Sequence, residues 1–458
     1  MLSGRISGIA ISLGLLAFGA SAARAEDPQP VTPDVALSQE DRIEELERVV
    51  QGLTEELART RVGVAVPEDA EGSLTSQWGY GPAASKVYEQ DRGLSIGGYG
   101  EGHYTAFVGN KGDESNSADL ERAVIYMGYK FNDHIVFNSE IEFEHASTEH
   151  TVTTGADGRE GGSVSVEFAA LDFMWMPELN SRVGLLLLPV GFLNLIHEPP
   201  FYYGVNRPEV ERVLIPSTWR ENGAGIFGRL REDLEYAAYA VNGMNAQGFT
   251  DEGIRDGRQN GSNAFAEDLA FVGRLDYTPL AGLLVGASVY AGDSGQDQRV
   301  DLALGGSTKI PSTPTILWDL HAQYENRGLH LRGLFTMTHL GDAGSLTRDL
   351  QAEDPANTFA IAQGLLGGYG EVAYDVLPLI FPGTDRFLAP FYRFEWYDTQ
   401  WNMPSGFGAD RSQQIMVNTV GLQYEPIPNV VLKADYRNRR AAEGSLPDEF
   451  NLGFGYTF

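Results

Sequence analysis

The last nine residues, Phe450-Asn-Leu-Gly-Phe-Gly-Tyr-Thr-Phe458, alternate strictly between two kinds of side chain. Large apolar groups take every second position, and small or polar groups lie between them. A period of two is that of a β-strand whose two faces differ in polarity. Because the strand ends the chain on an aromatic residue, we expect lipid rather than a protein core to cover its apolar face.

The N-terminus predicts export. Arg5 is followed by an apolar stretch from Ile6 to Phe18 and by Ala23-Arg-Ala25, which is typical of a cleaved signal peptide over residues 1–25. A short membrane anchor is the alternative, but the apolar stretch is brief for a span of about 20 residues. The chain has no cysteine, which in an exported protein excludes a disulfide framework. We therefore expect closure of a large sheet to supply stability.

Composition narrows the class of partner. The formal net charge is −30, so nucleic acid is excluded as an expected partner. The chain is rich in Gly (54), Tyr (20) and Phe (23), and its mean hydropathy is slightly below zero. These features suit a barrel with one wet face and one apolar face.

An N-terminal segment over 26–62 contains a predicted coiled coil over 38–61. Its apolar positions recur at spacings of three and four, in the order Ile43, Leu46, Val50, Leu53 and Leu57. That is a heptad seam, which favours oligomerisation in the periplasm. A monomeric helix lying against the barrel is the alternative, because about three heptads are marginal for an isolated coil. Residues 63–93 are expected to form an irregular linker leading into the barrel.

Residues 94–458 alternate in polarity over repeated segments, which predicts a transmembrane β-barrel. The expected strands number about sixteen, an even number as in bacterial barrels. They are 94–108, 119–131, 134–147, 164–176, 182–190, 223–231, 234–246, 268–279, 283–292, 315–326, 329–339, 367–378, 387–397, 412–426, 429–439 and 447–458. Short links alternate with long polar loops, so both termini are expected in the periplasm. Soluble β-sandwich domains are the alternative, but no linker divides these residues.

The opposite faces of the same strands carry charges. Arg or Lys facing lipid at the bilayer midplane costs about 2–4 kcal/mol, so these residues should line water. The expected pore lining is Arg122, Lys130, Glu140, Glu142, Asp172, Arg229, Arg274, Asp319, Arg332, Glu371, Arg393, Glu395, Lys433, Asp435 and Arg437. Rows of opposite sign are one way in which a pore sets selectivity. The alternative for each residue is a salt-bridged wall position without a role in transport.

The third outer loop, Gly191 to Asn222, is unusually rich in aromatic and aliphatic residues. Folding into the lumen would bury that apolar surface against the wall. The expected constriction then consists of Tyr202, Tyr203, Arg207, Glu209, Arg212 and Arg220. An outer lid or a clasp between subunits is the alternative.

Three motifs carry a family resemblance, and they are Glu211-Arg-Val-Leu-Ile-Pro216, Gly223-Ala-Gly-Ile-Phe-Gly228 and Tyr236-Ala-Ala-Tyr-Ala-Val-Asn-Gly243. This region resembles the phosphate- and polyphosphate-selective porins of Gram-negative outer membranes, and the terminal strand resembles the closing strand of outer-membrane barrels. The resemblance implies a homotrimer of sixteen-stranded channels, a constricting third loop and a basic ladder for anions. The chain has only five lysines, which departs from that ladder. The expectation is therefore a porin for small hydrophilic solutes or ions in the outer membrane, with ion preference left open.

Other chemistry is weakly indicated. Glu144-His145, Glu149-His150 and the acidic stretch from Asp251 to Asp256 lack a complete metal-ligand set, so we expect no metal or cofactor. Gly97 to Gly102 lies in a strand, where small residues would permit close packing against the entering chain. Four histidines lie on expected strands, namely His103, His321, His330 and His339. The sequence identifies no catalytic partner for any of them. An enzyme is therefore not expected, while a tether or adhesin remains the alternative to a channel.

Overall fold

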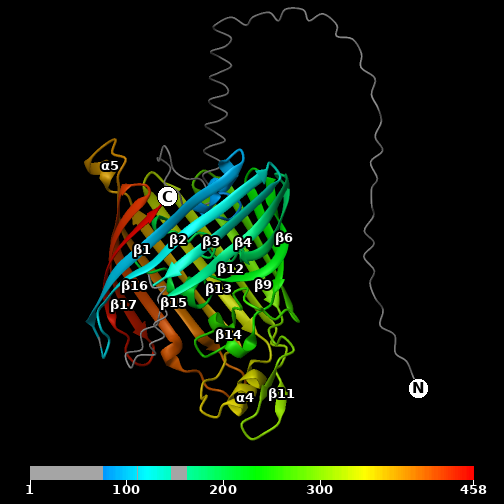
Figure 1. The fold of residues 1–458 in the computed structure, drawn as a ribbon. Coiled ribbons are helices and arrows are strands. Elements are labelled where there is room, and N and C mark those ends of the chain that lie inside the picture. The colour runs from blue at the N-terminus through cyan, green and yellow to red at the C-terminus, as the bar shows by residue number, and fades with distance from the viewer. Residues whose placement is uncertain (1–75, 111, 146–161) are drawn as a thin grey trace, which may run out of the picture. The chain divides into compact units, whose positions relative to one another are not determined.

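The structure of the protein is a computed structural model that describes residues 76–110, 112–145 and 162–458. The predicted signal peptide over 1–25 and the predicted coiled coil over 38–61 lie outside these residues. Within them, the chain forms one closed antiparallel barrel (Figure 1).

The barrel contains sixteen strands, each paired with its neighbour in sequence, and it closes where the first strand pairs with the last. The strands are β1 (Gly93–Gly109), β2 (Ser117–Asn132), β3 (Ile135–Glu144), β4 (Ser163–Met176), β5 (Leu179–Leu187), β6 (Arg220–Arg231), β7 (Leu234–Asn242), β8 (Leu269–Leu280), β9 (Leu283–Gly292), β12 (Thr315–Asn326), β13 (Leu329–Leu340), β14 (Gly364–Tyr374), β15 (Phe387–Asn402), β16 (Gln414–Ile427), β17 (Val430–Ala441) and β18 (Asp448–Thr457). The predicted fold class and strand count are confirmed. The strand ends differ from expectation by a few residues, most at β15, which continues to Asn402.

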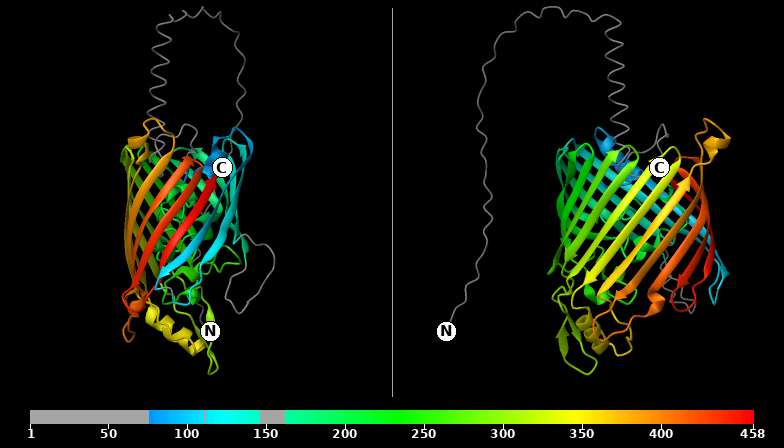
Figure 2. Two further views of the ribbon diagram at one scale, coloured as in Figure 1. Left: turned by 90° about the vertical axis from the view of Figure 1, so that its left-hand side faces the viewer. Right: turned by 180° about the vertical axis from the view of Figure 1, so that it is seen from behind.

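The segments outside the barrel strands contain short helices and one hairpin, which the sequence pattern did not predict. They are α2 (Pro82–Glu89), η2 (Pro199–Phe201), α3 (Glu209–Val213), η3 (Ala246–Gly248), η4 (Arg255–Gly257), β10 (Arg299–Asp301), β11 (Ser307–Lys309), α4 (Ala343–Glu353), α5 (Leu377–Ile380) and η5 (Arg411–Gln413). Helix α4 and the β10–β11 hairpin lie at one end of the barrel, here named the long-loop end (Figures 1 and 2). The C-terminus and α5 lie at the other, the short-turn end. No helix in the described part of the chain is long and apolar enough to cross a membrane.

The terminal strand closes the barrel as its alternation predicts. Phe454 and Leu452 are 46% exposed on the outside, while Asn451, which precedes Leu452, is fully buried inside. The Phe458 backbone N–H donates to the Gly98 carbonyl at 2.8 Å, and the Gly98 N–H donates to the Phe458 carbonyl at 2.9 Å. The last residue is therefore part of the seam that joins both ends of the sheet.

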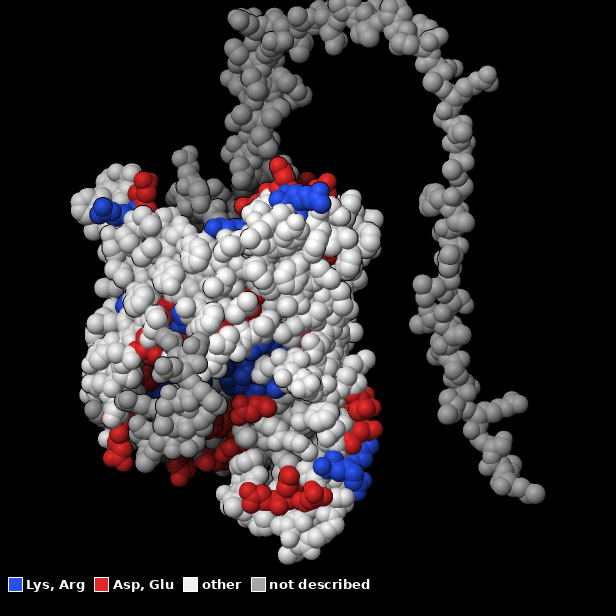
Figure 3. Space-filling model, viewed as in Figure 1, with Lys and Arg blue, Asp and Glu red and all other residues white. Residues whose placement is uncertain are grey.

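The outside of the wall is apolar. Leu320 is 55% exposed and Leu422 is 48% exposed, whereas their inward neighbours Asp319 and Gln423 are 0% and 2% exposed. Figure 3 shows a largely uncharged band of wall between the charged short-turn rim and charged residues toward the long-loop end. A soluble protein would leave this band in water, but a bilayer covers it. The barrel is thus built to span a membrane.

We expect Leu422→Arg to destabilise the barrel in lipid, because it places a charge on the lipid-facing side of β16. The expected loss is about 2–4 kcal/mol if the position lies near the bilayer midplane. Leu304→Arg is the matched control, since Leu304 is fully exposed outside the barrel strands. Urea unfolding of both variants in lipid vesicles measures the difference. Equal stability of the two variants would contradict a lipid-facing wall.

Residues 76–90 enter the barrel interior and include α2, where the sequence predicted an irregular linker. The Asn138 side chain donates to the Ala84 carbonyl at 2.9 Å, and the Tyr88 hydroxyl donates to Asp172 at 2.6 Å. A Cβ atom on Gly97 would lie 2.6 Å from the Ala83 carbonyl oxygen. This confirms that the small residues of β1 permit close packing against the entering chain.

Candidate functional site

The third loop, residues 188–219 between β5 and β6, lies inside the barrel and is held there by wall side chains. Lys433 donates to the Tyr202 carbonyl at 2.8 Å, and Arg393 donates to the Tyr203 carbonyl at 2.8 Å. Asp435 accepts from the Val205 N–H at 2.6 Å. Charged side chains of β15 and β17 therefore form hydrogen bonds with the backbone of the third loop.

The same pattern continues on neighbouring strands. Glu395 accepts from the Val210 N–H at 3.1 Å, and Asp319 accepts from the Gly191 N–H at 3.1 Å. Arg332 donates two hydrogen bonds to the Phe201 carbonyl, at 3.1 and 3.2 Å. Many of the charges predicted to line the pore are thus fully engaged in fixing the third loop.

Two carboxylates of α3 bind back to the wall. Glu209 pairs with Arg437 and, at 2.8 Å, with Arg439. Burial alone would raise the pKa of Glu209, but the two guanidinium groups outweigh it and hold that pKa at about 2. Glu211 accepts from the Tyr369 hydroxyl at 2.6 Å and from the N–H groups of Phe192 and Leu193 at 2.8 and 2.7 Å. The loop is consequently clamped at the first residue and at the middle of α3.

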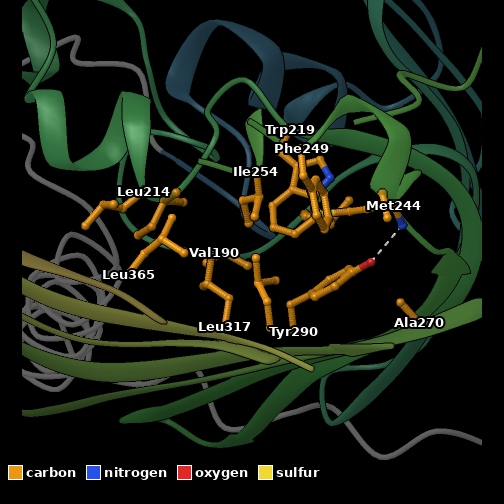
Figure 4. Close-up of a cluster of buried hydrophobic side chains, with 14 of the residues drawn as sticks. Val190, Leu214, Trp219, Met244, Phe249, Ile254, Ala270, Tyr290, Leu317 and Leu365 are labelled. Carbon is orange, nitrogen blue, oxygen red and sulfur yellow. Dashed lines mark hydrogen bonds between the residues drawn. The ribbon is translucent and has the colours of Figure 1, made fainter. Parts of the chain in front are cut away.

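An apolar cluster packs residues of the third loop and of the following long loop against the barrel wall (Figure 4). Trp219 of the third loop packs on Tyr290 of β9, with ring centroids 4.6 Å apart. Met244 and Phe249 come from the fourth loop, residues 243–268, and both are fully buried. The Met244 N–H donates to the Tyr290 hydroxyl at 3.0 Å. The fourth loop therefore also folds inward, which the sequence analysis did not predict.

A charged cavity of about 420 Å³ lies between the third loop and the long-loop half of the wall. We call it the arginine chamber. Eight arginines and five glutamates line it: Arg122, Arg207, Arg212, Arg220, Arg255, Arg258, Arg437, Arg439, Glu142, Glu144, Glu167, Glu209 and Glu449. Two of these arginines, Arg255 and Arg258, come from the fourth loop. Because arginines outnumber glutamates in the lining, the formal charge of the arginine chamber is positive, although the net charge of the chain is −30.

The chamber arginines fall into two groups. Arg122 pairs with Glu142 at 3.1 Å, Arg220 pairs with Glu167 at 2.9 Å, and Arg437 and Arg439 share two glutamates. The other four form no ion pair within the described residues, and they are Arg207, Arg212, Arg255 and Arg258. Burial, followed by repulsion from neighbouring arginines, lowers the pKa of Arg255 to about 9 and that of Arg258 to about 10. These four guanidinium groups thus crowd together in the chamber without a direct ion pair to any described carboxylate.

A second cavity of about 230 Å³ lies toward the short-turn end. It is partly apolar, with Trp78, Phe192, Leu195, Ile196, Phe201 and Leu284 in its lining. Arg229 pairs there with Glu235 at 2.7 Å, and Arg274 pairs with Asp276 at 2.7 Å. We call it the mixed cavity, because its charges are largely neutralised.

Several predicted site residues prove to be wall anchors. Tyr202 is buried and its hydroxyl donates to Glu101 at 2.6 Å, and Tyr203 stacks on Phe391 with centroids 5.5 Å apart. Neither tyrosine lines either cavity. Arg220 is the first residue of β6 rather than part of the loop.

The remaining predicted lining residues also have partners. Lys130 donates to the Tyr88 carbonyl at 3.3 Å, and Asp172 pairs with Arg182 at 2.7 Å. Glu371 pairs with Arg393 at 3.2 Å, and Glu140 contacts His197 at 3.3 Å. These contacts fit the alternative of paired wall residues.

His321 has carboxylate partners that the sequence did not reveal. Its ring nitrogens lie 2.5 Å from Asp319 and 2.9 Å from Asp276. The Ser288 hydroxyl donates to Asp319 and not to His321. A serine nucleophile requires a hydrogen bond to its base, so this arrangement is a structural network of the wall.

Comparison with known proteins places the chain among barrel proteins. No protein-family model matches the chain. A protein of Aquifex aeolicus (strain VF5), described as uncharacterized, is 37% identical over 387 residues, which cover 82% of each chain. This chain belongs to the same family as that Aquifex protein.

Solved structures share the barrel fold of this chain. An OmpT variant of Vibrio cholerae that lacks loop L8, described as an outer membrane protein, is 11% identical, with a TM-score of 0.51. The match covers 81% of this chain and 100% of that one. OmpF of Salmonella typhi, in complex with daunomycin, is 15% identical, with a TM-score of 0.50 over 81% of this chain and 99% of that one. At these identities the likeness shows the fold alone.

Proposed function

We propose that the protein is a passive diffusion channel of the outer membrane, with the inward third loop as its constriction and a preference for small anions. The observation that carries this proposal is the arginine chamber, in which four arginines form no ion pair within the described residues. A guanidinium stays charged at neutral pH and offers five donors to an anion. A positive chamber at one mouth of the lumen favours anions over cations.

The position of the chamber explains how anions are favoured in an acidic protein. Surface charges are screened over about 8–10 Å at physiological salt, so acidic loops act only weakly on an ion already inside the chamber. Walls of low dielectric constant concentrate the field of the arginines there. Local charge therefore governs ion preference more than the net charge does.

The third loop divides the lumen into two vestibules. Its residues Arg207 and Arg212 face the arginine chamber, and Phe192 and Leu195 face the mixed cavity. We infer that solutes pass from one cavity to the other along this loop, whose clamped backbone fixes the width of the passage. Tyr202 and Tyr203 are left out of the constriction because they are buried against the wall.

Location and assembly follow from the same reasoning. The apolar wall and the alternation of short turns with long loops support an outer membrane, with the short-turn end in the periplasm. A homotrimer stays a prediction from the family resemblance, and phosphate-type selectivity stays one alternative that the resemblance raises. A tether or adhesin is less favoured, because such a role requires no positive chamber inside the barrel.

Single-channel recording tests the proposal. Folded protein added to a planar lipid bilayer is expected to give stepwise increases in current, because each inserted barrel opens a fixed passage. Heat-unfolded protein is the control and is expected to give none. Folded barrels that insert without any current step would refute the channel.

A further inference from the structure

A buried cluster beside the arginine chamber joins the third loop to the wall. His197 of the third loop meets Glu140 of β3 and Glu167 of β4, and the three side chains are at most 1% exposed. His197 Nε2 lies 3.3 Å from Glu140 Oε1 and 3.4 Å from Glu167 Oε2. One ligand atom from each residue lies within 4.8 Å of the others. Three potential metal ligands thus converge on one point.

The distances from His197 Nε2 to the two carboxylate oxygens fit a bound cation better than a direct hydrogen bond. A charge-assisted hydrogen bond between nitrogen and oxygen is about 2.7–2.9 Å long, and both distances exceed that. Ligands bound tetrahedrally at about 2.0–2.1 Å lie roughly 3.3–3.4 Å apart along each edge. The spacing from the imidazole to each carboxylate matches that edge.

Unpaired atoms give an independent indication. Among the residues that the structure describes, Glu140 Oε2, Glu167 Oε2 and His197 Nδ1 have no hydrogen-bond partner. A buried carboxylate oxygen without a partner is costly, and native proteins rarely leave one. A cation held between His197 Nε2 and Glu167 Oε2 would remove that cost for the Glu167 oxygen, which is both unpaired and one of the converging atoms.

The second oxygen of Glu167 is held in place by neighbours. Thr218 donates to Glu167 Oε1 at 2.7 Å, and Arg220 donates to the same oxygen at 2.9 Å. These contacts leave Oε2 directed toward His197. Carboxylate ligands of metals are commonly oriented by such outer hydrogen bonds.

We propose that Glu140, Glu167 and His197 bind one divalent cation of the zinc type, which fastens the third loop to β3 and β4. One imidazole nitrogen and two carboxylate oxygens suit zinc and leave a fourth position open. Glu167 also lines the arginine chamber, which gives ions a route to the site. Arg220 opposes cation binding, but its charge is already paired with Glu167. The competing occupant is a proton on His197.

Metal titration of the folded protein, stripped with a chelator and passed through a desalting column, tests the proposal. Zn²⁺ is expected to bind at one per chain by calorimetry, and Co²⁺ to give the intense visible absorption of four-coordinate cobalt. Glu140→Gln, Glu167→Gln and His197→Ala are expected to abolish this binding. Thr218→Val is expected to weaken it by about 10–100-fold, the usual effect of losing an outer hydrogen bond to a ligand.

Matched controls keep the test decisive. Glu425→Gln and His330→Ala alter interior residues that line neither cavity, and they are expected to bind metal like the unaltered protein. Resistance to unfolding on unheated electrophoresis gels confirms that each variant is folded. Absence of one-per-chain binding in folded protein would overturn the proposal, as would full binding by Glu167→Gln. Bilayer currents are independent of this readout, so the metal site and the channel can fail separately.

Discussion

Removal of the four unpaired arginines of the chamber is expected to abolish the anion preference of the channel. The variant combines Arg207→Gln, Arg212→Gln, Arg255→Gln and Arg258→Gln. One unit charge acts on an anion about 8 Å away with roughly 2 kcal/mol at an effective dielectric constant of about 20. Since about 1.4 kcal/mol corresponds to a factor of ten, we expect the anion-to-cation permeability ratio to fall at least tenfold. Reversal potentials under a potassium chloride gradient measure that ratio.

A matched control separates local charge from net charge. It combines Arg231→Gln, Arg299→Gln, Arg327→Gln and Arg386→Gln, which are exposed positions outside both cavities. This control changes net charge by the same amount and is expected to keep the ion preference. An equal shift in both variants would mean that the chamber does not govern selectivity.

The second large effect is expected from Glu211→Ala, which removes the clamp at α3. The change leaves the Tyr369 hydroxyl and two loop N–H groups without their acceptor. Each buried donor without a partner costs about 1–3 kcal/mol, so α3 should lose its attachment to Tyr369 and the third loop should loosen there. Single-channel conductance is then expected to rise, and trypsin is expected to cleave the loop at Arg212.

Glu353→Ala is the control for this clamp, because Glu353 is an exposed carboxylate at the end of α4. It is expected to leave both readouts unchanged. If the Glu211→Ala barrel had normal conductance and a trypsin-resistant third loop, Glu211 would not be what holds that loop in place.

The barrel itself could be predicted from the sequence because its two faces meet different solvents. Lipid outside and polar contacts inside impose a period of two on every strand, and the terminal strand from Phe450 to Phe458 shows that period without interruption. Turn residues and loop lengths then fixed the number of strands. Strand ends were less predictable, since a strand such as β15 continues to Asn402, five residues past its expected end at 397.

The interior was less predictable because alternation identifies a face but not a partner. Arg393 was correctly assigned to the inner face, yet it is fully buried under the third loop rather than free in a passage. Arg255 and Arg258 were missed because the fourth loop looked like an acidic surface loop. Phe249 and Ile254 were the available signal, since apolar residues within a polar loop indicate burial.

The sign of the reversal potential of the unaltered channel is the most direct test of its proposed preference for anions. Folded protein in a planar bilayer separates two concentrations of potassium chloride, and the potential at zero current is recorded. We expect the sign set by chloride, because the arginine chamber admits anions more readily than cations. A potential with the sign set by potassium would contradict it.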